Sequence, residues 1–242
     1  MQSCIIIAFG TKTANSSVTI DSKDVIKGNK NIINAEIPVS GYSEISLNVP
    51  GEVIYRQLSE KNPSLKIEVD ANILPLLEAK VEGNCLKISK KKNVNIQPSR
   101  LTIRTNSTNL NKISTSGFAN IHLNGKIKSK NMDINISGSS NITSEQLYCD
   151  FLNVKVSGLG NLQLNGAGKR TSFSVSGLGN IHAYNYVVEE FNGNISGSGE
   201  MYINATKSLN MMVSGSGKIR YTGHPQVSSN ISGSGSIKSA NE

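Results

Sequence analysis

The sequence contains no tryptophan, only three cysteines, and few charged residues, at 17% of the chain. The cysteines, Cys4, Cys85 and Cys149, lack the paired spacings that a disulfide framework or a zinc site requires. We therefore expect Cys85 and Cys149 to be small core residues. No apolar run reaches the roughly 20 residues of a membrane-spanning helix.

The residues that are abundant favour strands joined by tight turns. Among the 242 residues there are 22 glycines, together with many Asn, Ser, Ile and Val. Such a composition predicts an all-β protein. The chain is long enough for one large β domain or two smaller ones.

The formal charge of +8 does not by itself indicate a nucleic-acid partner. The basic residues are spread along the chain and are not interleaved with aromatic residues, as a nucleic-acid platform requires. The densest cluster, Lys87 to Lys92 followed by Arg100 and Arg104, is interpreted as a solvated strand edge that its lysines protect against further pairing. The alternative is contact with acidic glycans or lipid head groups.

An internal repeat organises the second half of the chain. A Ser-Gly pair followed by a short turn occurs seven times, and the steps between the first glycines are 21, 20, 19, 20, 18 and 18 residues. The seven pairs begin at Ser116, Ser137, Ser157, Ser176, Ser196, Ser214 and Ser232. Regular spacing of this kind is typical of repeat proteins.

Apolar and polar residues alternate on both sides of each motif, so each repeat predicts a strand, a glycine corner, a second strand and a return segment. Hairpins would place consecutive motifs at opposite ends of a sheet, whereas a coil places them in one column. We therefore predict a right-handed parallel β-helix or solenoid with Ser-Gly-Xaa-Gly corners, formed by seven repeats over residues 105–242.

Stacking of the coils predicts two ladders. The inner apolar ladder consists of Ile121, Ile142, Leu162, Ile181, Met201, Ile219 and Ile237. The corner ladder consists of Asn120, Asn141, Asn161 and Asn180, and the same position holds Glu200, Lys218 and Ser236 in the last three repeats.

Residues 32–104 show the same alternation without the Ser-Gly motif, and form either a separate β domain or less regular opening coils that cap the solenoid. Strands are expected around Ile45–Val49, Val53–Tyr55, Leu65–Val69, Leu86–Ile88 and Leu101–Ile103. Between them, Ala71 to Lys80 is the best candidate for a short helix, which Pro75 limits to one or two turns.

Residues 1–31 are predicted to be a leader and linker, partly disordered, because a short apolar run is followed by a polar stretch. One interpretation is that Cys4 is the lipid-modified first residue of an exported lipoprotein. The other is a short frayed terminus.

The combined motifs resemble a known bacterial family, the putative auto-transporter adhesins with a head GIN domain. The resemblance covers about residues 32–239 and rests on Gly41–Leu47, Val69–Pro75, Leu86–Ile88 and the run of Ser-Gly turns. It implies a right-handed β-helix-like fold and an exported, often lipid-anchored protein of Gram-negative bacteria, in the periplasm or at the outer membrane and cell surface. It implies no binding residues.

One outward-facing column is the candidate ligand surface. It lies directly after the inner apolar ladder and consists of His122, Thr143, Gln163, His182, Tyr202 and Arg220. Three coils separate its two histidines, so we expect no shared metal site. No cofactor motif is present in the sequence.

Three functions remain for this chain. The leading hypothesis is a non-catalytic cell-envelope adhesin that binds an extended glycan or an envelope protein, with any membrane attachment through lipid alone. The second is a structural scaffold that forms homo-oligomers through its coil ends. The third is a polysaccharide-cleaving enzyme, which is disfavoured because the carboxylates of the repeats fall at different registers.

Overall fold

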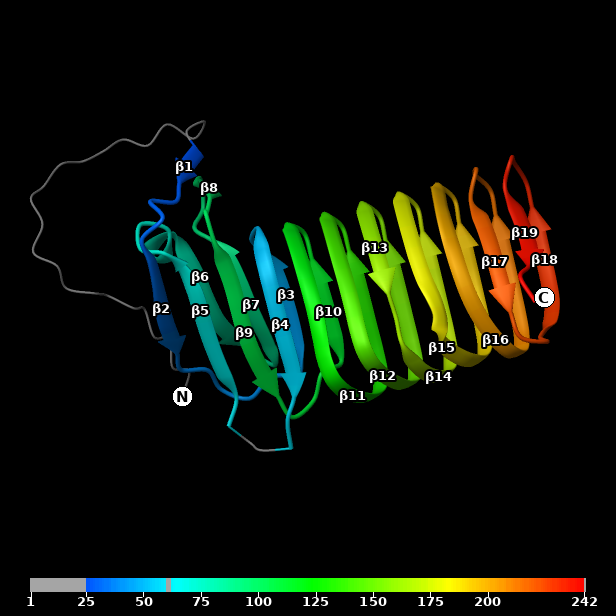
Figure 1. The fold of residues 1–242 in the computed structure, drawn as a ribbon, viewed down its shortest axis with the longest axis horizontal. Coiled ribbons are helices and arrows are strands. Elements are labelled where there is room, and N and C mark those ends of the chain that lie inside the picture. Colours follow the sequence, from blue (N-terminus) through cyan, green and yellow to red (C-terminus); the bar gives the residue numbers. More distant parts are fainter. Residues whose placement is uncertain (1–24, 60–61, 242) are drawn as a thin grey trace, which may run out of the picture.

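The computed structural model describes residues 25–59 and 62–241 and shows a parallel β-solenoid of about six turns, which the seven corners delimit. From β10 onwards the coils follow one another along a single axis in sequence order, and the chain's N-terminal strands lie at the opposite end from β18 and β19 (Figure 1). The strands of the regular coils are β10 (Lys112–Thr115), β11 (Phe118–Ile136), β12 (Ser139–Val156), β13 (Leu159–Gln163), β14 (Gly166–Val175), β15 (Leu178–Ile195), β16 (Ser198–Val213), β17 (Lys218–Thr222), β18 (Gln226–Ile231) and β19 (Ser236–Ser239).

Each coil contributes to two layers, called here the first and second sheets, which long strands such as β11 and β15 join into one hydrogen-bonded 17-stranded sheet. The first sheet contains the segments that follow the Ser-Gly corners, and the second sheet contains the segments that precede the next corners. Every strand pair between regular coils is parallel. The predicted coil, rather than a meander of hairpins, is therefore confirmed.

The register of the coils confirms both predicted ladders. Ile121 pairs with Ile142, and the same column continues through Leu162, Ile181, Met201, Ile219 and Ile237. All of its members except the last are buried, and Ile237 is half-buried. Next to this column, the side-chain amide of Asn141 donates to Oδ1 of Asn120 at 2.7 Å.

The core between the two sheets is mainly apolar, with a few buried hydroxyl groups such as those of Thr105, Ser107 and Thr171. Stacked aliphatic residues fill most of it, and Phe173 and Phe191 meet edge to face with their ring centroids 5.0 Å apart. In the next position of the Phe173 column, Gly193 leaves room for the side chain of Met211. Stacked side chains of this kind form one continuous dry core, so neighbouring coils stabilise one another.

Residues before the regular coils form strands that join the same two sheets. These are β2 (Ile32–Ile37), β3 (Glu44–Asn48), β4 (Gly51–Gln57), β5 (Ser64–Asp70), β6 (Leu77–Glu82), β7 (Cys85–Lys90) and β9 (Leu101–Ser107). The five strands expected from alternation in residues 32–104 are thus present. A separate pair consists of β1 (Val25–Lys27) and β8 (Asn95–Gln97), which are parallel.

The β3–β4 coil lies between the regular coils and a more irregular end. β3 pairs in parallel with β10 on one side and β7 on the other, and β4 does the same with β11 and β9. Beyond them, β2 and β5 in one sheet and β6 in the other pair antiparallel. The chain therefore leaves the stack after β4, builds this end, and returns to continue at β10.

Two details of this region differ from the sequence prediction. Lys87 does not lie on a sheet edge, because it pairs with Ser46 of β3 on one side and with Lys80 of the outer strand β6 on the other. Ala71 to Lys80 is not a helix of one or two turns: it contains one 3-10 turn, η1 (Leu74–Leu76), and then enters β6. In β6 the half-buried residues alternate with exposed ones, so packing against the core favours a strand there.

A buried carboxylate holds the start of the described chain. Asp70 accepts hydrogen bonds from the backbone N–H of Lys30 at 2.7 Å and of Ser99 at 2.8 Å, and from the Ser99 hydroxyl. Asn72 binds the same segment, since its Nδ2 donates to the carbonyl of Lys27 at 2.8 Å. Residues 25–31, which the linker prediction included, are thus part of the fold, whereas Cys4 lies outside the described residues.

Candidate functional site

The predicted outward column exists on the first sheet. His122 pairs with Thr143, and the same register continues through Gln163, His182, Tyr202 and Arg220. Their side chains are exposed or half-buried, whereas the residues on either side of them along each strand are buried, apart from Tyr221 after Arg220, which is half-buried. In each of six successive coils, the outward face of the strand therefore presents one polar side chain to solvent at this position.

At the N-terminal end of the column, the side chains contact one another and a neighbouring carboxylate. His122 Nδ1 lies 2.9 Å from the Thr143 hydroxyl, and its Nε2 lies 3.5 Å from a Glu52 carboxylate oxygen. Glu52 comes from β4 in the neighbouring coil. These contacts already use both ring nitrogens, so His122 has little capacity left for a ligand.

Aromatic side chains gather at the other end of the column. The rings of His182 and Tyr202 are stacked, with centroids 4.7 Å apart and an angle of 10° between their planes. That separation is close to the spacing of neighbouring parallel strands, so the rings stack along the solenoid axis. Each ring therefore covers one face of the other.

Tyr184 is oriented differently and was missed by the sequence analysis. Its ring meets that of Tyr202 edge to face, with centroids 5.2 Å apart and an angle of 79°. Its ring plane therefore runs roughly along the solenoid axis, an orientation in which a ring face can meet a ligand. The signal in the sequence was its position, since Tyr184 lies two residues after His182 and shares its face of the strand.

A carboxylate completes this cluster. The Tyr202 hydroxyl donates to Glu200 Oε2 at 2.7 Å, and Lys218 Nζ lies 3.8 Å from Glu200 Oε1. The hydrogen bond from Tyr202, followed by the charge of Lys218, lowers the pKa of Glu200, and the same hydrogen bond raises the pKa of Tyr202. We define Tyr184, Glu200, Tyr202 and Arg220 as the aromatic cluster; it combines ring surface, hydrogen-bond acceptors and a guanidinium.

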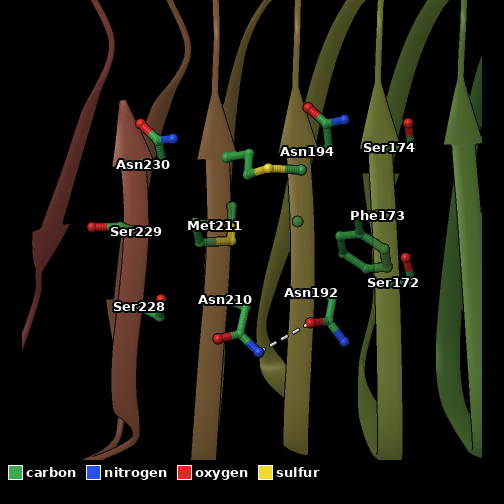
Figure 2. A pocket seen from close by; sticks show the side chains of 12 residues that line it. Ser172, Phe173, Ser174, Asn192, Asn194, Asn210, Met211, Ser228, Ser229 and Asn230 are labelled. Carbon is green, nitrogen blue, oxygen red and sulfur yellow. Dashed lines mark hydrogen bonds between the residues drawn. The ribbon is translucent and has the colours of Figure 1, made fainter. Parts of the chain in front are cut away.

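A shallow trough lies on the second sheet, and the sequence analysis did not identify it (Figure 2). Its volume is about 570 Å³, it is open to solvent, and no charged side chain lines it. Two outward columns form its sides, and Asn210 on one of them donates to Asn192 Oδ1 at 3.1 Å. The other lining residues are Ser172, Phe173, Ser174, Gly193, Asn194, Met211, Met212, Ser228, Ser229 and Asn230.

The structure shows no arrangement that would bind a metal in the described residues. Within residues 25–59 and 62–241, no three His, Cys, Asp or Glu side chains lie close enough together to hold an ion. Cys149 is buried, which raises the pKa of its thiol to about 12, and burial also raises the pKa of Cys85. Neither thiol has the low pKa of a nucleophile.

Comparison with known proteins gives a consistent result. The family model described as "Putative auto-transporter adhesin, head GIN domain" matches residues 41–225. A solved structure of a putative adhesin from Bacteroides fragilis is similar over 88% of this chain and 99% of its own, with 30% identity and a TM-score of 0.85. No curated protein is significantly similar to the chain.

Two further solved structures come from Parabacteroides. A putative lipid binding protein from Parabacteroides distasonis has 29% identity and a TM-score of 0.71, over 90% of this chain and 100% of its own. A putative adhesin from Parabacteroides merdae has 26% identity and a TM-score of 0.72, with the same coverage. No helix in the part of the chain that the structure describes is long and apolar enough to cross a membrane.

Proposed function

Because the chain belongs to the family of putative auto-transporter adhesins with a head GIN domain, we propose that it is an exported, non-catalytic adhesion module that binds an extended glycan along the first sheet. The observation that carries this proposal is the aromatic cluster at the end of an in-register polar column. Flat repeated strands suit a ligand that itself repeats, because several weak contacts along one chain add up in affinity.

The cluster supplies the chemistry that a sugar ring needs. The Tyr184 ring offers an apolar surface for the C–H face of a sugar, and Glu200 offers carboxylate oxygens to its hydroxyls. Arg220, one coil beyond Tyr202, adds a planar set of donors and favours glycans that carry carboxylates. Gln163 and Thr143 extend the polar column towards the N-terminal end.

The trough on the second sheet gives weaker support to another ligand. A lipid-binding function, suggested by the name of the Parabacteroides distasonis relative, calls for an enclosed apolar cavity. The trough is instead open and bordered by serine and asparagine side chains. The aromatic cluster therefore favours a glycan over an acyl chain.

The contacts of the repeat carboxylates support a non-catalytic role. Lys169 Nζ lies 2.8 Å from Asp150, Lys207 Nζ lies 2.6 Å from Glu189, and Arg170 Nε lies 3.0 Å from Glu190. Glycoside cleavage needs two carboxyl groups that face one substrate bond. Incubation with a polysaccharide panel should accordingly release no reducing or unsaturated ends.

Export and lipid attachment are parts of the same proposal, with Cys4 as the attachment residue. Expression of the complete gene in a Gram-negative host should place the protein in the envelope fraction. Mass spectrometry of the N-terminal peptide tests acylation, and an unmodified Cys4 would remove the lipid anchor from the proposal.

A glycan array tests the binding itself. We expect the wild-type chain to bind an extended glycan, and Tyr184→Ala combined with Glu200→Gln to reduce its affinity at least about tenfold. The matched control is Ser172→Ala with Ser174→Ala on the opposite sheet, which should bind like wild type. An array with no binding above background would count against a glycan ligand. An equal loss of affinity in both variants would count against the first sheet as the binding face.

A further inference from the structure

The corners of four successive coils carry an exposed apolar stripe. Phe118, Leu159 and Leu178 are 65%, 51% and 56% exposed, and they occupy the same register position, directly after the first glycine of each motif. Ser139 fills this position in the coil between Phe118 and Leu159. We define the corner stripe as Phe118, Ser139, Leu159 and Leu178, in that order along the axis.

The four corners that carry the stripe contain no charged residue. Residues 116–120, 137–141, 157–161 and 176–180 contain no Asp, Glu, Lys, Arg or His, although the chain as a whole has a formal charge of +8. Two copies of a basic protein repel each other over most of their surfaces. At these four corners a second copy can therefore approach without bringing like charges together. The nearest carboxylates, Glu52 and Glu200, lie one coil beyond each end of the stripe, where His122 and Lys218 contact them.

The order of side-chain sizes is self-complementary. When a second copy is placed antiparallel about a two-fold axis centred between the second and third coils, Phe118 faces Leu178 of that copy. Leu159 then faces the small side chain of Ser139, which leaves space for it. Two-fold pairing of one surface with itself is the commonest form of homo-oligomer contact.

From this geometry we propose that the corner stripe is a self-association surface, and that two copies pair along it in an antiparallel arrangement. Other two-fold alignments leave Phe118 or Leu178 outside the overlap of the four corners. The proposal differs from assembly through the coil ends, because it uses the side of the solenoid.

A lipid bilayer fits this edge less well. Beside the corner stripe runs the exposed ladder of Asn120, Asn141, Asn161 and Asn180, whose amides bond to one another along the axis. Insertion of the stripe into lipid would also bury amide groups that have no partner there, at a cost of several kcal/mol each. A second copy presents the same amides at the same edge, where they can hydrogen bond across the interface.

The pairing is expected to be weak. Four coils at strand spacing extend over about 14 Å, so the contact buries less than the roughly 1,200 Å² of a standard stable interface. Association should therefore appear only at high concentration and, because the four corners are uncharged, should change little with salt.

Sedimentation velocity of the full chain, from about 10 µM to about 1 mM, tests the proposal in the range expected for small interfaces. We expect a concentration-dependent dimer in the wild type. Replacement of Phe118, Leu159 and Leu178 by serine should weaken it more than tenfold. Serine occupies this register position at Ser139 and Ser198, so the fold should tolerate the change. The control is Val187→Ser with Met212→Ser, two exposed apolar residues on other surfaces, which should leave association unchanged.

Ser139→Leu separates specific pairing from general stickiness. In the antiparallel pair this leucine collides with Leu159 of the other copy, so the dimer should weaken by at least about tenfold although apolar area has been added. Stronger association of Ser139→Leu would overturn the proposal, as would a wild type that stays monomeric at about 1 mM. A vesicle flotation assay covers the alternative occupant. If the wild type floats with neutral phosphatidylcholine vesicles and the triple serine variant does not, lipid rather than a second copy covers the stripe.

Discussion

Gly158 lies directly against the carbonyl oxygen of Gly138 in the coil before it, so a Cβ atom at Gly158 would overlap that oxygen. The same relationship recurs at Gly177, Gly197 and Gly215, each against the preceding corner. Next to it, the backbone N–H of Leu159 donates to the carbonyl of Gly138 at 3.0 Å. The glycines thus allow the corners to approach closely enough to continue the backbone hydrogen bonds around the turn.

Gly158→Ala should destabilise the fold strongly, by about 3 kcal/mol, because backbone of two coils would have to move apart. Gly160→Ala is the matched control two residues away. Its Cβ would meet only side-chain atoms, Val156 at 2.8 Å and the end of Ile136 at 3.3 Å, and Ala119 and Ser140 occupy the equivalent position in earlier coils. We expect a loss of about 1 kcal/mol there. Urea unfolding, monitored by circular dichroism, measures the free energy of unfolding of both variants. Similar losses of stability in the two variants would contradict the role of the first glycine.

The asparagine ladder predicts a position-dependent loss of stability. Asn141 donates to Asn120 and accepts from Asn161, whereas Asn180, at the end of the ladder, donates to Asn161 alone. Asn141→Ala should cost about 1 kcal/mol and Asn180→Ala about half as much, since water can replace part of each exposed bond. Thermal unfolding compares them, and a larger effect at Asn180 would show that the ladder is not the cause.

Asp70 should make the stability of the fold depend on pH. Burial alone would raise the pKa of Asp70, but the hydrogen bonds from Ser99, Lys30 and Arg100 outweigh it and lower the pKa from 3.8 to about 2. A carboxyl group whose pKa is lower in the folded state than in the unfolded state stabilises the fold at pH values above its unfolded pKa. This contribution is lost as the pH falls towards its folded pKa. Asp70→Asn should therefore be less stable than wild type at neutral pH, and the difference should shrink between about pH 4 and pH 2.

Glu82 is the control for that experiment. The pKa of Glu82 is also lowered to about 2, by hydrogen bonds and charges from Lys80 and Lys87, but this group is exposed. Salt screens exposed ion pairs, so the effect of Glu82→Gln should nearly vanish at high ionic strength, whereas that of Asp70→Asn should persist. A salt-sensitive Asp70 effect, or one that is constant over the whole pH range, would contradict the hydrogen-bond explanation.

Cys149 should react with thiol reagents only when the protein unfolds. It is buried in the core, and its raised pKa leaves almost no thiolate at pH 8. In a Cys4→Ser, Cys85→Ser background, we expect labelling by a maleimide to be negligible in buffer and complete in denaturant. Rapid labelling of the native chain would show that this part of the core opens readily.

The sequence by itself determined the regular coils. A step of 18 to 21 residues between Ser-Gly pairs and a strict alternation of apolar residues leave one stacking register, which places Ile121, Ile142 and Leu162 in one column. Side chains in a parallel coil meet the same position of the next coil, so a local repeat already specifies the long-range contacts. The outward column from His122 to Arg220 followed for the same reason.

Only the tertiary structure decided the irregular end and the surroundings of the columns. That β3 contacts β10 across an excursion of more than fifty residues, or that Asp70 holds the backbone of Lys30, depends on pairings between segments with no shared repeat. β6 became a strand rather than a helix because β7 and the core were there to pair with it. The orientation of Tyr184 and the exposure of Phe118, Leu159 and Leu178 likewise depend on neighbouring coils, because packing in three dimensions, and not local sequence, sets which part of an outward side chain remains open to solvent.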